Sequence, residues 1–249
     1  MYLKLFGGAS IEGAEGPMTG RGVQRRRLAL LALLAAQRQR GMSRERITAI
    51  LWPEADANRA RHLLSDSIYR INQSLGAEVL LAVGDELRLN PGILPSDIAR
   101  FSEALERGEW ARATDLYAGP FLDGVFLADT PEFDQWVDGE RSRLAADFGR
   151  AIEQRAEEAE RSGDTGAAVR HWRRASAHDA LNARVALRYM RALDGPASES
   201  PLSSSPASAG SRWQPALELR VQREGPGHPG SRSPAGSRRR RRGECATSG

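Results

Sequence analysis

Apolar positions at the start of the chain alternate briefly and then follow helical spacing. Residues 2–6 predict a short strand and residues 9–12 a second one, each followed by a glycine-rich turn. Residues 23–39 predict a helix with leucines on nearly every side, which should be the buried centre of a small domain. Ser43 is a suitable N-cap for a second helix, which Trp52-Pro53 ends.

A third helix is predicted over residues 57–75 and is amphipathic. Its apolar stripe recurs at helical spacing and consists of Leu64, Ile68, Ile71 and Leu75. The opposite face is polar and contains Arg59, His62, Asp66, Tyr69, Arg70 and Gln73. Residues 79–83 and 86–89 flank Gly84-Asp85 and predict a hairpin. This order of elements is that of a winged helix-turn-helix, in which the exposed third helix enters the major groove of DNA.

The pattern beyond residue 96 is helical throughout. Helices are predicted over residues 97–107, 109–117, 131–161, 165–177 and 180–193. Small and large residues alternate along the last three in the manner of a tetratricopeptide (TPR) hairpin: Ala156, Gly163, Ala167, Ala168, Trp172, Ala175 and Leu181. The bulky aromatic residues of this half are most simply packing residues: Tyr117, Phe121, Phe133, Trp136 and Trp172. The expected fold is therefore mainly α with small β elements.

Residues 194–249 differ in composition from everything before them. They contain 11 Ser, 8 Gly and 7 Pro in 56 residues, without apolar periodicity, and predict a disordered tail. The run Arg238–Arg242 is either a solvated segment or a nucleic-acid arm. A third hypothesis is a shifted reading frame near Leu193, because the change falls inside a helical repeat and would leave that repeat truncated and uncapped. The predicted organisation is thus 1–95, 96–193 and 194–249.

Charge is distributed unevenly along the chain. Residues 1–95 have 13 basic and 9 acidic side chains, whereas residues 96–193 have 14 and 18. A basic first part and an acidic second part indicate different partners. The longest apolar run, residues 28–36, is too short for a membrane span, and the start lacks the features of a signal peptide. We therefore expect a cytoplasmic protein without a membrane partner.

The sequence gives little indication of an enzyme. The single cysteine, Cys245, excludes a disulfide scaffold and a cysteine-based zinc site. The four histidines have no metal-binding spacing, and His171 and His178 are expected to be a solvated pair. Neither a phosphate-binding loop nor a Gly-x-Ser-x-Gly motif occurs. We expect no catalytic site, no cofactor, no metal and no small-molecule substrate.

Residues 116–124, with the sequence LYAGPFLDG, together with Glu132-Phe133 and Trp136, resemble the signature of the bacterial transcriptional activator domain (BTAD). Upstream, residues 51–54 and 59–71 resemble the second and third helices that precede it in that family. Together they resemble the antibiotic-regulatory (SARP) type of activator, an OmpR-like winged helix followed by BTAD. The resemblance implies a transcriptional activator.

The polar face of the third helix supplies the main DNA-binding candidates, together with basic residues on the wing and before the first helix. They are Arg59, His62, Tyr69, Arg70, Gln73, Arg88, Arg25, Arg26 and Arg27. Asp66 could read a cytosine, but pairing with Arg70 at i+4 is favoured. The expected partners are duplex DNA, RNA polymerase and a second copy of the chain. The alternatives are a TPR-like protein-interaction adaptor and an inert truncated regulator.

Overall fold

The computed structural model describes residues 1–13, 16–17, 25–38 and 40–195. Its first element is a small antiparallel sheet in the order β1-β2-β3. The strands are β1 (Tyr2–Lys4), β2 (Ser10–Gly13) and β3 (Gly16–Pro17). Gly7 has a φ of +73° between β1 and β2, a conformation that glycine adopts without strain. The two predicted strands are confirmed, whereas β3 was not anticipated.

Three helices follow the sheet. They are α1 (Arg25–Gln37), α2 (Arg44–Leu51) and α3 (Ala57–Leu75). Every residue of α1 from Leu28 to Ala35 is buried, so the prediction of a buried central helix is confirmed. The Ser43 hydroxyl accepts a hydrogen bond from the Arg46 N–H and caps α2, as predicted. Asp56 caps the start of α3, and Gly76 ends it in the left-handed conformation.

The predicted hairpin lies directly after α3. It consists of β5 (Leu80–Val83) and β6 (Glu86–Leu89), paired antiparallel around Gly84. A third strand, β4 (Met42–Ser43), pairs with β6 and completes a sheet in the order β4-β6-β5. Local periodicity could not predict β4, because two residues are too few to establish a pattern.

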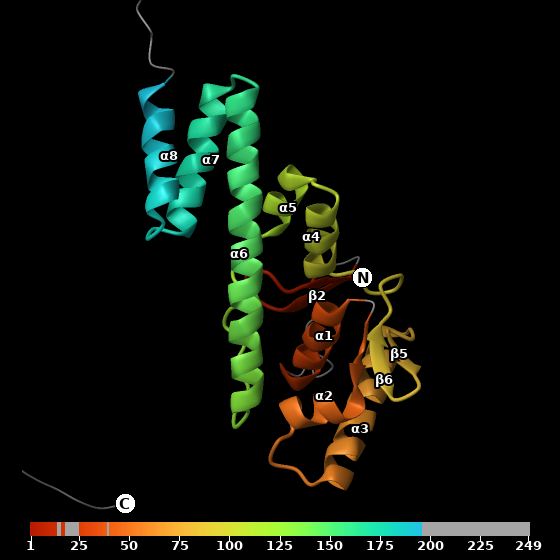
Figure 1. Cartoon of the computed structure of the whole chain (residues 1–249). Helices are drawn as coiled ribbons and strands as arrows, with labels where there is room; N and C mark the ends of the chain where they lie inside the picture. Colours follow the sequence, from red (N-terminus) through yellow and green to blue (C-terminus); the bar gives the residue numbers. More distant parts are fainter. Residues whose placement is uncertain (14–15, 18–24, 39, 196–249) are drawn as a thin grey trace, which may run out of the picture. The chain divides into compact units, whose positions relative to one another are not determined.

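The remaining helices are α4 (Asp97–Glu106), α5 (Trp110–Leu116), α6 (Pro131–Arg161), α7 (Thr165–His178) and α8 (Ala183–Asp194). The long helix α6 runs beside α5 on one side and α7 on the other, and α8 packs against α7 (Figure 1). Ala156, Ala168, Trp172 and Ala175 are buried between these helices, as the TPR-like pattern predicts. Leu181 was wrongly included in that pattern: it precedes α8 and is 96% exposed.

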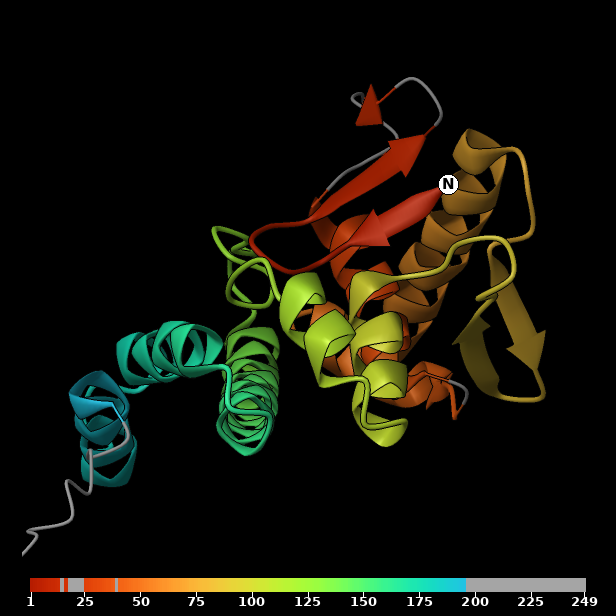
Figure 2. The same cartoon turned by 90° about the horizontal axis from the view of Figure 1, so that it is seen from above.

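The first strand joins the two halves of the chain. The Leu3 N–H donates to the Pro95 carbonyl, and the Leu5 carbonyl accepts a hydrogen bond from the Leu122 N–H. Phe6 packs edge-on against Phe101 of α4, with ring centroids 5.3 Å apart. In the view from above, β1 and β2 lie along one edge of the helices (Figure 2). One contiguous set of buried apolar residues therefore runs through both halves.

These observations confirm the predicted fold class, mainly helical with small sheets. The boundary between 1–95 and 96–193 stays a prediction. Apart from Asp194 and Gly195, the predicted tail lies outside the described residues, and so does the frame-shift hypothesis. Within the described ranges, no helix combines the length and apolarity that a membrane crossing requires.

Candidate nucleic-acid interface

Helix α3 presents most of its surface to solvent. It buries only a narrow stripe, formed by Ala60, Leu64, Ser67 and Ile71. All five predicted site residues of this helix are exposed: Arg59, His62, Tyr69, Arg70 and Gln73. The structure therefore brings these side chains together on one protruding helix, as the spacing predicts.

The first turn of α3 is held by its cap. The carboxylate of Asp56 accepts hydrogen bonds from the N–H groups of Asn58 and Arg59, both at 3.0 Å. These bonds fix the backbone from which the Arg59 side chain projects. Asn58 and Arg61 are also exposed at this end, with the Arg61 guanidinium 3.5 Å from the Asn58 Oδ1. Sequence reasoning missed both, because it considered only the face opposite the apolar stripe, whereas exposed residues also lie beside that face.

Helix α2 supports α3 across a short turn. Trp52 ends α2, is 4% exposed, and donates its backbone N–H to the Thr48 carbonyl. The buried indole anchors the segment between the two helices, and α2 packs against α3. This arrangement leaves the outer face of α3 uncovered.

Three of the predicted candidates take part in contacts between side chains of α3. The Arg70 Nε lies 2.8 Å from both carboxylate oxygens of Asp66, so the favoured pairing of these residues is confirmed. The Gln73 amide donates to the Tyr69 hydroxyl at 3.4 Å. Both contacts lie at the surface, where such interactions are weak enough to exchange for a ligand.

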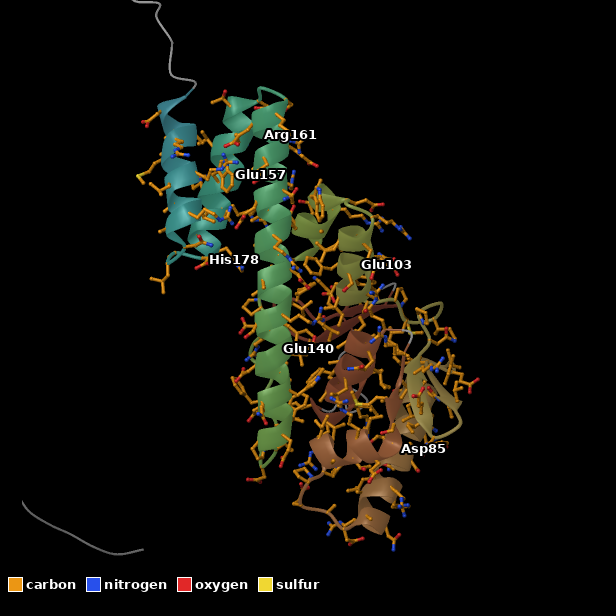
Figure 3. All side chains as sticks on the ribbon, viewed as in Figure 1. Asp85, Glu103, Glu140, Glu157, Arg161 and His178 are labelled. Atoms are coloured by element: carbon orange, nitrogen blue, oxygen red, sulfur yellow. The ribbon has the colours of Figure 1, made fainter. Side chains whose placement is uncertain are left out.

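The hairpin β5–β6, which corresponds to the wing, has more acidic than basic side chains. Arg88 on β6 donates to Glu86 at 3.0 Å, and its Nε is buried without a hydrogen-bond partner in the described part of the chain. Its side chain packs over Gly41, where an added Cβ would lie 2.7 Å from the Arg88 Cγ. Asp85 is exposed beside Gly84 at the tip of the hairpin (Figure 3). Arg88 is thus held along the hairpin and away from its tip.

The three arginines at the start of α1 differ in exposure. Arg25 is exposed, whereas Arg26 forms an ion pair with Glu54 at 3.3 Å. Arg27 is 8% exposed and belongs to the packed base of the helix. Arg25 is therefore the most accessible of the three.

The prediction that His171 and His178 are a solvated pair is wrong for His178. Its Nε2 lies 2.8 Å from the Ala145 carbonyl oxygen of α6. The ring packs edge-on against Phe148 at 4.8 Å, at the end of α7 (Figure 3). His171 is partly buried, and this burial, with nearby arginines, lowers its pKa. Helix–helix packing at α6 draws His178 inward, which its sequence position did not indicate.

Comparisons with known proteins relate one part of the chain to a family and most of the chain to a known fold. The family model of the bacterial transcriptional activator domain matches residues 96–198. No curated protein gives a significant match. A solved structure described as Mycobacterium tuberculosis EmbR in complex with a low affinity phosphopeptide superimposes with a TM-score of 0.59 at 20% identity. The match covers 76% of this chain and 53% of that chain, so it shows a shared fold over about half of EmbR.

The matched domain is one of transcriptional regulators and is not an enzyme class. The winged helix before it completes the order of elements that the sequence resemblance implied. Residues 96–198 match the model of the bacterial transcriptional activator domain, and the helices and hairpin before them follow the order of a winged helix-turn-helix, as the resemblance to SARP-type activators implies.

Proposed function

We propose that this protein is a transcriptional regulator that binds duplex DNA in a sequence-dependent way through α3. The observation that supports this proposal is the protruding polar face of α3, braced by α2 and capped at its first turn by Asp56. Side chains of this type can donate to phosphate oxygens and to base edges in the major groove.

The length of α3 divides the candidates between two tasks. Arg59 and Gln73 are fourteen residues apart, which corresponds to about 21 Å along a helix axis. We assign the first turns, with Arg59 and His62, to base edges, because recognition helices enter the groove by their N-terminal residues. The positive end of the helix dipole also favours phosphate there. Tyr69, Arg70 and Gln73 then contact the sugar-phosphate backbone.

The helical half contacts proteins in this proposal. Its acidic balance disfavours close approach to DNA and suits a surface on the transcription machinery, RNA polymerase in particular. Two copies would occupy direct or inverted repeats. Activation, as opposed to repression, rests on the family whose model matches residues 96–198.

The test is duplex binding by the full chain, titrated across salt. The Arg59→Ala/Arg70→Ala variant should flatten the dependence of log K on log salt by about one unit, because Arg70 no longer neutralises a phosphate. It should also weaken binding to the preferred duplex, because Arg59 no longer contacts a base edge. The matched control is Arg107→Ala/Arg112→Ala, which removes the same charge from exposed positions around α5. Equal reductions in both variants would mean that binding follows net charge and not α3.

Sequence dependence needs a separate measurement. Selection from a random duplex pool should enrich a repeated site, and His62→Ala should relax the preference at one position of that site. Binding to the pool without enrichment of any site would mean that the protein binds DNA without sequence preference.

A protein-interaction adaptor is the second candidate, because of the outer face of α8. Leu187, Met190 and Leu193 lie on it and are 51%, 51% and 56% exposed. Exposed apolar faces of this kind often contact proteins. An adaptor predicts duplex binding without a steep salt dependence, so the same titration separates the two functions.

A further inference from the structure

A groove of about 750 Å³ lies where α1, α4 and α6 meet, apart from the polar face of α3. Its walls come from the ends of α1 and α4 and from the middle of α6; Figure 3 marks Glu140 on α6, on one wall. The charged side chains that line it are Arg38, Arg40, Glu106, Glu140, Arg143, Asp147 and Arg150. A groove of this size could hold a small molecule.

Guanidinium groups line the groove from two sides. Arg38 and Arg40 follow the end of α1, and Arg143 and Arg150 project from α6. Four arginines face three carboxylates, so the groove has an excess of positive charge. Within the described residues, Arg40 has no ion pair.

The end of α1 has an unusual backbone. Arg38 has a φ of +56°, in the left-handed region that favours glycine. Its guanidinium forms two parallel hydrogen bonds with the Glu106 carboxylate of α4, one of them 3.0 Å long. Residues in this conformation persist where the surroundings hold them, and they are common at ligand sites. The Arg38 guanidinium is therefore fixed in place at the edge of the groove.

On the opposite wall the arginines are connected by shared carboxylates. Arg143 donates to Glu140 at 2.6 Å and to Asp147 at 3.3 Å, and Arg150 also pairs with Asp147. The side chains of Glu140 and Asp147 are only 18% and 14% exposed, and they hold guanidinium nitrogens of Arg143 and Arg150. The side chain of Arg150 nevertheless remains 76% exposed. The carboxylates position the guanidinium groups without covering them.

From these observations we propose that the groove between α1, α4 and α6 binds a small anion with two or more phosphate groups. Guanidinium groups match phosphate oxygens in bidentate geometry, and an anion with several phosphates can contact both walls at once. This site is separate from the α3 surface and does not depend on the proposed DNA binding.

The probe is inorganic tripolyphosphate, titrated calorimetrically into the full chain at about 0.15 M salt, where contacts between distant surface charges are screened. Arg40→Gln and Arg143→Gln change one wall each and should each weaken binding about tenfold, the effect of losing hydrogen bonds to a charged group. The matched control is Arg112→Gln, on α5 outside the groove, which should bind as the unchanged chain does. Circular dichroism of each variant verifies its fold.

A second arm separates this site from a DNA-phosphate surface. The Arg59→Ala/Arg70→Ala variant should retain full tripolyphosphate affinity, and the two groove variants should retain duplex affinity. Absence of tripolyphosphate binding, or an equal loss in Arg112→Gln, would overturn the proposal. Loss of duplex binding in the groove variants would show that the arginines contact nucleic acid instead.

Discussion

Asp97 connects the β1 segment to the start of α4 through hydrogen bonds of its carboxylate. Its Oδ2 accepts hydrogen bonds from the Leu5 N–H at 2.8 Å and the Phe6 N–H at 2.9 Å, while its Oδ1 accepts from Ile98. The side chain is buried at the first turn of α4. The carboxylate is the hydrogen-bond acceptor for the N–H groups of Leu5 and Phe6. No other side chain of the described residues accepts from these two groups.

Replacing Asp97 with alanine should therefore lower the free energy of unfolding by about 2–5 kcal/mol, because two buried N–H groups lose their acceptor. The measurement is urea denaturation of both proteins. Asp138→Ala is the control: that carboxylate is 74% exposed on α6, and its removal should change stability by less than about 0.5 kcal/mol. Similar values for the two variants would show that the β1 segment does not need this anchor.

Asp97 should also affect the pH dependence of stability. Burial raises its pKa, an effect that outweighs the hydrogen bonds from the Phe6, Leu5 and Ile98 N–H groups, which lower it. The folded chain then binds this proton more tightly than the unfolded chain, whose Asp pKa is about 3.9. The stabilising contribution is complete below that value and is lost as the pH rises through the raised pKa of the folded state.

The difference in unfolding free energy between the unchanged chain and Asp97→Asn isolates this effect from the other titrating groups. Between about pH 4 and about pH 7, the unchanged chain should lose stability relative to Asp97→Asn as the pH rises. A pH-independent difference would contradict the raised pKa.

At the scale of elements, the hairpin β5–β6 differs from the wing that the sequence suggested. Its tip presents Asp85, while Arg88 is held against Gly41 and Glu86. A negative charge at the tip repels DNA phosphates if the hairpin approaches the backbone.

Asp85→Asn should accordingly increase duplex affinity about two- to fivefold at low salt, and the gain should shrink as added salt screens the charge. Fluorescence anisotropy with a labelled duplex measures it. Asp138→Asn removes an equal charge on α6 and should leave affinity nearly unchanged. A gain of equal size in both would place the hairpin away from DNA.

The bounds of two helices with strong local signals agree with the prediction, whereas α1 is shorter than the predicted 23–39. Helix α3 has an Asp cap, a regular apolar stripe and a terminal Gly76, and α6 begins at Pro131; both agree with the predicted bounds. The exposed face of α3 followed from the same periodicity. The two-residue strands β3 and β4 have no such pattern. The position of His178 against α6 and the packing of Arg88 over Gly41 depend on contacts between distant segments, which local spacing does not encode.

At the scale of the molecule, the aromatic residues connect the halves. Phe6 lies 4.7 Å from Tyr117, ring to ring, and Tyr117 stacks on Phe148 of α6 at 4.3 Å. Arg141 of α6 donates to the carbonyls of Phe121 and Leu122, both at 2.8 Å, and fixes the loop that follows α5. A single packed interior spans the sequence from β1 to α6.

Phe6→Ala should therefore destabilise both halves together, by about 3–5 kcal/mol, as expected for removing a buried phenyl ring. Hydrogen exchange followed by mass spectrometry should report the same decrease in protection in peptides from α1 and from α6. The control is Phe126→Ala, at a residue that is 63% exposed. A decrease confined to one half would show that the halves unfold independently.

The position of β1 also bears on how such proteins can be divided. The family match begins at residue 96, yet residues 3–8 occupy the space between Pro95, Asp97 and Pro120–Phe121. The family match and the packed structural unit thus begin at different residues. A helical half cut out at residue 96 would lack residues 3–8 and would expose the aromatic rings that Phe6 covers. A fusion that replaces residues 1–95 must therefore supply a segment that fits the same space.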